Sequence, residues 1–182
     1  EFTYPYALNF GCQNSGAQKY FVILSAHSLP MSDTWLEDGL KNFEIYKDRK
    51  ILGVYGWMKS LPDSSIWEKI YFDFFCWKIL RKILPGVSII KRPKTGVLGF
   101  TNAIVRRDLW QKYQFNENYG LGGEDTEWAG HWMAKSYVAI KDVKFSVEHS
   151  HSLGLLAFIK QWKYWYSLGK PQKFGELEHR KK

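Results

Sequence analysis

The fold is decided by two apolar runs, Tyr-Phe-Val-Ile-Leu-Ser-Ala at residues 20–26 and Ile-Leu-Gly-Val-Tyr-Gly-Trp at residues 51–57. Short continuous apolar runs with β-branched residues are typical of buried strands in parallel sheets. Residues 27–30 end the first run, and Ser32 or Asp33 is placed to cap a helix that continues to about Phe43. Strand, helix and strand at this spacing predict a βαβ unit and an α/β fold.

Further elements are predicted on both sides of this unit. A short helix is expected at residues 6–18, a strand at 97–103, a short helix that begins at 109–110 and a longer helix at 124–135. Alternating apolar residues at 137–147 predict a pair of strands near a sheet edge. A polar, basic tail is expected from Gly169 onward.

Composition limits the class of protein. The chain has 182 residues, which is one domain or most of one, and 45% hydrophobic residues are enough for a core. The formal net charge of +8 favours anionic partners such as nucleotides, nucleic acid or acidic lipid. Cys12 and Cys76 are too few for a disulfide scaffold, so we expect reduced thiols and a cytoplasmic protein. No run of 18 uncharged apolar residues predicts a transmembrane helix.

Two segments combine aromatic and basic residues in a helical pattern, at 61–84 and at 153–168. The first is bounded by Asp63 and Ser64, which can cap a helix, and by Pro85-Gly86. A helix packed on the core is one interpretation. The other is a helix that lies in an anionic membrane surface.

The pair Glu124-Asp125 follows three glycines, Gly120, Gly122 and Gly123, and precedes an apolar helical pattern. Acids at this position can simply cap a helix and are stabilised by its dipole. Acids beside a Gly-rich loop can also act as a general base toward a substrate hydroxyl. The stretch alone leaves both interpretations open.

Histidines lie at two predicted strand ends. His27 follows the first apolar run, and His149 and His151 close the last one. Because ligands of α/β sheets gather at the carboxyl ends of strands, these residues are candidate ligands for a metal or a phosphate. A single histidine after a strand is more often a structural hydrogen-bonding group. Residues two apart on a strand share a face, so both later rings can point the same way.

Four motifs follow one another between about residues 2 and 151. They are a strand end followed by Pro and Trp-Leu (22–36), an Asn-containing strand end followed by Arg-Arg-x-x-Trp (101–110), a Phe-x-Glu segment followed by Glu-Asp and a helix with Trp-Ala (115–129), and Val-x-His-x-His (147–151). Their order resembles glycosyltransferase family 2, which has the GT-A fold. Four ordered motifs are far more specific than any one of them.

The resemblance implies a GT-A-type, Rossmann-like mixed sheet flanked by helices. It implies an inverting glycosyltransferase that moves a sugar from a nucleotide-sugar donor to an acceptor hydroxyl of a saccharide or lipid-linked saccharide, in capsule or lipopolysaccharide biosynthesis. Asp125 is then the candidate general base, with Glu124 beside it. The candidate donor- or acceptor-binding residues are Asn102, Arg106, Arg107 and Trp128. For the two arginines, a solvated basic helix turn is the alternative.

Two departures from the family pattern limit this interpretation. Ser25-Ala26-His27-Ser28 replaces the acidic metal motif, so a Mn²⁺ or Mg²⁺ ion would depend on His27, His149 and His151, or cationic side chains would replace it. The first nucleotide-binding βαβ unit is also missing. We therefore expect a fragment of a longer protein, with a donor site that is incomplete and an uncovered sheet edge that favours self-association.

We expect a GT-A-like domain at residues 1–152, followed by an aromatic, basic helix and a polar tail at 153–182. The predicted location is the cytoplasm, with peripheral contact at the inner face of the cell membrane. The alternative function is a non-catalytic relative that binds a membrane or a sugar. Nucleic-acid binding is not expected, because the basic residues are scattered and no nucleic-acid motif is recognisable.

Overall fold

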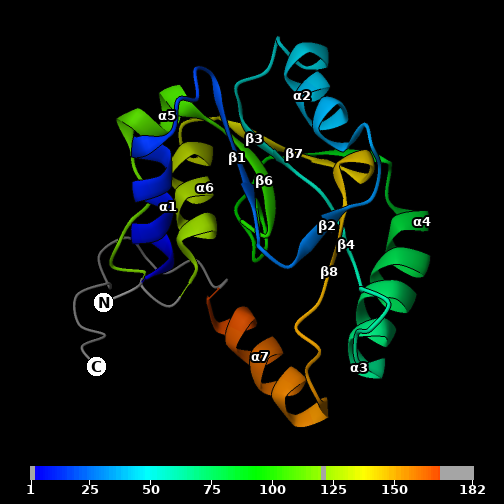
Figure 1. Cartoon of the computed structure of the whole chain (residues 1–182). Helices are drawn as coiled ribbons and strands as arrows, with labels where there is room; N and C mark the ends of the chain where they lie inside the picture. Colours follow the sequence, from blue (N-terminus) through cyan, green and yellow to red (C-terminus); the bar gives the residue numbers. More distant parts are fainter. Residues whose placement is uncertain (1–2, 120–121, 169–182) are drawn as a thin grey trace.

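The computed structural model describes residues 3–119 and 122–168, and its centre is a mixed sheet (Figure 1). In spatial order, its five strands are β1 (Tyr20–Leu24), β6 (Asn102–Arg106), β3 (Ile51–Tyr55), β7 (Val138–Asp142) and β5 (Val87–Ile90). β6 runs antiparallel to both β1 and β3, β7 is parallel to β3, and β5 is antiparallel to β7. The predicted α/β class with a mixed sheet is therefore confirmed.

Helices cover both faces of this sheet. α1 (Tyr4–Asn14), α5 (Arg107–Lys112) and α6 (Glu124–Met133) lie on one side, and α2 (Trp35–Ile45) lies on the other (Figure 1). Successive side chains of a strand point to opposite faces of the sheet and so contribute to two separate cores. Val105 packs on the α5 and α6 side, whereas Ile104 packs with Trp35 of α2. The molecule is thus built in three layers.

A second, three-stranded sheet lies beside the first. It has the spatial order β2 (Ser28–Pro30), β8 (Val147–His149) and β4 (Met58–Lys59), with β8 antiparallel to β2 and parallel to β4. Residues 27–30, expected only to end a strand, instead supply β2. This pairing sets Ser28 opposite His149.

Within the segment at 61–84, residues 66–83 form one continuous helical stretch made of α3 (Ile66–Glu68), the π-helix η1 (Lys69–Leu80) and α4 (Arg81–Ile83). Ser65 begins it through a capping box with Glu68, in place of the expected Asp63 or Ser64. α7 (Leu155–Leu168) contacts it, with the rings of Tyr71 and Phe158 5.8 Å apart. Among the described helices, none has both the length and the apolar character needed to cross a membrane.

The prediction that residues 20–26 form a buried strand of a parallel sheet is wrong. β1 is the edge strand and pairs antiparallel with β6. Phe21 and Ile23 are buried, but Val22 is 44% exposed and Leu24 is 38% exposed on the other face. A cavity of about 380 Å³ lies between this strand and α1. A five-residue apolar run fits a central strand and an edge strand equally well, so the sequence could not distinguish them.

Two strands do form within residues 137–149, and β7 lies next to the edge strand β5, but the prediction that the two strands form a pair is wrong. β7 lies inside the main sheet, a short 3₁₀ helix (η2, Val143–Phe145) follows, and β8 belongs to the second sheet. Residues 97–101 form turns, so the strand expected at 97–103 begins only at Asn102. β5 was not predicted. The tail expected from Gly169 and the glycine at position 120 lie outside the described residues.

Candidate functional site

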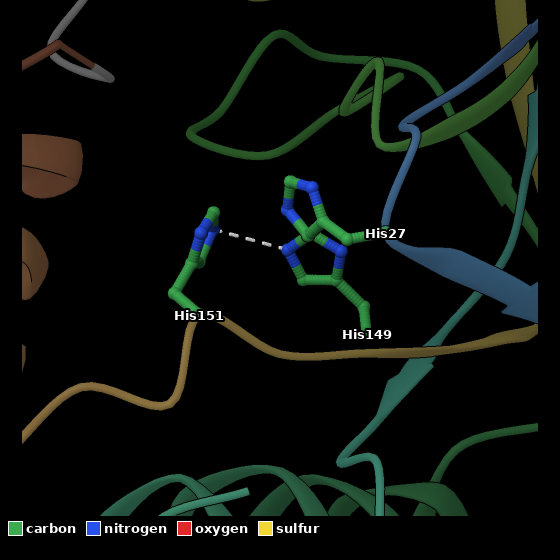
Figure 2. A group of neighbouring side chains, drawn as sticks. All are labelled: His27, His149 and His151. Atoms are coloured by element: carbon green, nitrogen blue, oxygen red, sulfur yellow. Dashed lines mark hydrogen bonds between the residues drawn. The ribbon is translucent and has the colours of Figure 1, made fainter.

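Three histidines from distant parts of the chain come together at the end of β8. His27 lies in the connection from β1 to β2, His149 ends β8, and His151 follows two residues later. Each offers a ring nitrogen within 4.8 Å of the other two. Figure 2 shows the ring of His151 facing the rings of His27 and His149. The β2–β8 pairing creates this histidine cluster, because it brings residue 27 beside residue 149.

Hydrogen bonds orient the buried member of the cluster. His149 is 4% exposed, its Nδ1 lies 2.9 Å from Ser28 Oγ, and its Nε2 lies 3.1 Å from His151 Nε2. Burial, with smaller effects of the neighbouring rings, lowers the pKa of His149 to about 3, and burial also lowers the pKa of His151. Both imidazoles are therefore neutral at pH 7, and neutral imidazole is the form that binds metals.

Glu68 anchors the chain segment that carries His151. It is 1% exposed and accepts hydrogen bonds from the His151 backbone N–H and from Ser150 Oγ, both at 3.0 Å. Burial alone would raise the pKa of Glu68, but these bonds and those from Ser65 lower it, so the side chain is a carboxylate. Glu68 was not among the candidate residues predicted from the sequence. The Ser-x-x-Glu spacing of a capping box was the available signal.

The acidic pair begins α6, as expected. Gly122 and Gly123 precede it with positive φ values of 115° and 101°, which favour glycine. Glu124 is 7% exposed, and its Oε2 has no hydrogen-bond partner among the described residues. Burial and the adjacent Asp125 raise the pKa of Glu124 to about 7. Asp125 is half-buried, and burial raises its pKa as well.

Residues 99–101 connect the acidic pair to the histidine cluster. The Asp125 carboxylate accepts hydrogen bonds from the backbone N–H groups of Phe100 and Thr126. The Thr101 carbonyl accepts a hydrogen bond of 3.1 Å from the backbone N–H of Ser25, and Ser25 Oγ lies 3.3 Å from the His27 ring nitrogens. Two motifs that lie about a hundred residues apart are therefore joined by one short segment.

Asn102 begins β6 at this same edge of the sheet. It is 3% exposed, and its Nδ2 donates a hydrogen bond to the Phe145 carbonyl. Its Oδ1 has no partner within the described part of the chain. Because its amide nitrogen bonds to the Phe145 carbonyl, Asn102 connects this end of β6 to η2, which precedes β8.

Three of the predicted binding residues do not reach this edge. Arg106 lies at the other end of β6, roughly 13 Å along the strand, and binds Asp108 at 2.6 and 2.8 Å. Arg107 donates its backbone N–H to Lys19 at that same far end. Trp128 is 0% exposed and donates its Nε1–H to the Tyr113 carbonyl. These positions separate the three residues from the histidine cluster, so their role in donor or acceptor binding stays a prediction without support from this site.

Lys141 is a further candidate, which was not predicted from the sequence. Its Nζ lies 3.4 Å from the centroid of the Trp57 ring, and it pairs in register with Tyr55 at the carboxyl end of β3. Burial lowers its pKa to about 8. Among the described residues, no carboxylate lies within 4.0 Å of this ammonium. A lysine inside the apolar run at 138–142 was the signal in the sequence.

A scan of the chain against protein-family models finds no match, and a search of the curated proteins finds none either. Any function therefore has to be argued from the motifs and from the geometry described above.

Proposed function

We propose that this chain is the acceptor-activating and metal-binding part of an inverting glycosyltransferase, acting on a nucleotide-sugar donor and a saccharide or lipid-linked saccharide acceptor of surface polysaccharide synthesis. One observation carries the proposal. His27, which stands where the resemblance expects a metal motif, converges with His149 and His151 from the last motif, and residues 99–101 connect this cluster to Asp125. This proximity supports the proposal, because parts of the first, third and last motifs of the resemblance lie near one another.

Asp125 is the proposed general base. Its carboxylate takes the proton of the acceptor hydroxyl while that oxygen forms a bond to the anomeric carbon, and the bond from this carbon to the nucleotide diphosphate breaks. No covalent enzyme intermediate is required. A raised pKa makes a carboxylate a stronger base, which favours this role. Glu124, whose pKa is about 7, stands beside it as a second proton acceptor.

The histidine cluster fits a transition-metal ion. Two ligand nitrogens at about 2.0–2.1 Å from one ion would lie about 2.9–3.4 Å apart for usual ligand angles, and the Nε2 atoms of His149 and His151 are 3.1 Å apart. Three imidazoles suit Zn²⁺ best. Imidazole can also ligate Mn²⁺, whereas Mg²⁺ prefers oxygen ligands. We therefore retain Mn²⁺ from the expected cofactors, add Zn²⁺ and set Mg²⁺ aside. When bound, the ion would offset the charge of the leaving diphosphate.

The surroundings of the cluster also fit a metal site. His27 and His151 are exposed, which leaves one side open to a substrate oxygen. Ser28 holds the second nitrogen of His149, as outer groups usually do for metal-bound histidine.

A non-catalytic sugar- or membrane-binding module is the second candidate. The replacement of the acidic metal motif by Ser25-Ala26-His27-Ser28 favours it, because neutral ligands do not offset the charge of a metal ion. Such a module would need neither a base at position 125 nor metal-dependent binding of a nucleotide.

Calorimetric titration of the full chain tests the metal site. We expect Mn²⁺ and Zn²⁺ to bind, UDP or dTDP to bind only with metal present, and His149→Ala to lose both. His131→Ala is the matched control, because this histidine stacks on Tyr113 and lies outside the cluster. Metal binding that survives His149→Ala would contradict the assignment.

Transfer or hydrolysis of UDP- and dTDP-sugars tests the base. Asp125→Asn should lower the rate by roughly 10²–10⁴-fold and leave nucleotide binding unchanged, because only proton removal is lost. Asp48→Asn, at an exposed carboxylate, is the control. Full transfer by the Asp125→Asn variant would remove the proposed base, and metal-dependent nucleotide binding without any turnover would favour the non-catalytic module.

A further inference from the structure

One face of the α3–η1–α4 helix exposes a row of large apolar side chains. Soluble proteins rarely expose such a continuous row unless it binds something. We call this row the apolar helix face. It consists of Ile66 (62% exposed), Ile70 (48%), Phe74 (56%), Phe75 (46%), Ile79 (37%) and Ile83 (74%).

The π-helix explains why these residues share a face. Its hydrogen bonds join residues i and i+5, so side chains that recur every four or five positions are aligned. The members of the apolar helix face recur at this interval. Glu68 and Phe72, which recur at the same interval, are 1% and 4% exposed and form the opposite, buried face. The helix therefore packs the side with Glu68 and Phe72 against the protein and exposes its apolar side to solvent.

α7 extends the apolar surface. The ring of Phe158 lies 5.8 Å from that of Tyr71 in η1, so the two helices are neighbours. Leu156 on α7 is 76% exposed and Ile159 is 39% exposed. In Figure 1, α7 lies at the bottom of the view and the α3–α4 helix lies at the right, with the start of α7 beside α3.

The charged side chains of these two helices that are not bound to other protein groups are mainly basic. The acids within residues 66–84 are already engaged: Glu68 is buried among hydrogen-bond donors, and Asp73 binds Ser60. Residues 155–168 contain no acid. The basic residues are Lys69, Lys78, Arg81, Lys82, Lys160 and Lys163. An exposed apolar row with only positive free charges complements an anionic lipid surface better than it complements an ordinary protein surface.

We infer that the apolar helix face binds the surface of an anionic lipid bilayer. The isoleucine and phenylalanine side chains enter the boundary between headgroups and acyl chains, while lysines such as Lys78 and Lys82 contact the phosphates. Arg81, whose guanidinium lies 5.0 Å from the Trp77 ring centroid, can extend along that ring toward the headgroups. This inference does not depend on the proposed catalytic function.

Co-sedimentation of the full chain with vesicles tests it. We expect binding to an equimolar mixture of phosphatidylglycerol and phosphatidylcholine, and binding on the order of tenfold weaker to phosphatidylcholine alone or at high salt. The double variant Lys78→Glu/Lys82→Glu should reduce binding to the anionic vesicles on the order of tenfold or more.

A second variant distinguishes binding through the apolar helix face from non-specific binding to vesicles. Phe74→Asp/Ile83→Asp should abolish vesicle binding, and circular dichroism should show a folded chain because both side chains are exposed. Ile45→Asp is the matched control, since Ile45 is 65% exposed on α2 and lies outside this face. Vesicle binding that is equal in all variants would overturn the inference. So would a wild-type dimer, seen by size exclusion, that dissociates in the Phe74→Asp/Ile83→Asp variant without any vesicle binding.

Discussion

Ser28 Oγ lies 2.9 Å from Nδ1 of His149, although 121 residues separate them in the sequence. The two residues face each other across the β2–β8 pair. This contact engages Nδ1 of His149, and the other ring nitrogen, Nε2, faces His151. The three-residue strand β2 thus decides which nitrogen of His149 is available to a ligand.

Removing this hydroxyl should weaken the metal site without removing it. We expect Ser28→Ala to lower the affinity for Mn²⁺ or Zn²⁺ by roughly 10–100-fold, because the His149 ring loses the group that orients it. Isothermal titration measures the change. Ser167→Ala, at an exposed hydroxyl on α7, is the control and should bind as the wild type does. An unchanged affinity in Ser28→Ala would show that the ring is held by packing alone.

Glu124 makes the stability of the protein depend on pH. Its pKa rises from the ordinary 4.5 to about 7 on folding. Ionisation of this carboxyl group therefore lowers the free energy of unfolding progressively as the pH rises from about 4.5 to about 7. Relative to the wild type, Glu124→Gln should therefore gain about 3 kcal/mol of unfolding free energy between pH 4 and pH 8.

Urea unfolding of both proteins at the two pH values measures this gain. The exposed Glu44→Gln variant is the control for the loss of a negative charge. A difference between Glu124→Gln and wild type that stays constant with pH would contradict the raised pKa.

Glu68 should show the opposite dependence. Its pKa is lowered on folding, so its carboxylate stabilises the protein above about pH 4.5 and this contribution is lost as the pH falls. Glu68→Gln replaces an acceptor oxygen with a donor facing the donors Ser65, Ser150 and His151. We expect a loss of about 1–3 kcal/mol at pH 7, measured by urea unfolding, and a smaller loss at pH 4. Equal losses at both pH values would argue against a lowered pKa.

Gly56 is a position where a methyl group has no room. A Cβ there would overlap the backbone carbonyl of Phe145 and approach Asn102 Nδ2, the two partners of a buried hydrogen bond. We expect Gly56→Ala to cost more than about 2 kcal/mol in thermal or urea unfolding.

Gly11 gives the matched comparison, since a Cβ at Gly11 in α1 meets nothing within 4 Å. Gly11→Ala should stabilise the protein by about 0.5–1 kcal/mol, as alanine does within helices. A stable Gly56→Ala variant would mean that η2 can shift away from this position.

The sequence was sufficient for features that depend on near neighbours. The apolar run at 51–57 predicted β3, and the Gly-Gly-Glu-Asp pattern predicted that α6 begins at Glu124. Spacing also predicted that His149 and His151 can point the same way, which their 3.1 Å approach confirms. These features follow from periodicity and capping within a few residues.

The buried face of a helix and the direction of a strand were harder to predict from the sequence. Trp128 and Arg106 occur in motifs that suggested a binding site, but helix packing buries the first and strand direction carries the second to the far end of β6. The sequence motif gives residue types and order. It does not give the face of α6 that meets the core or the direction in which β6 runs.

The sequence by itself determined the α/β class, the position of most helices and the candidate residues for binding a metal or accepting a proton. Only the tertiary structure decided that β1 is an edge strand, that residues 28–30 form a second sheet with β8, and that His27 therefore meets His149. The physical reason is that strand pairing joins backbone groups far apart in the chain, and its register is set by burial and turn geometry rather than by local preference.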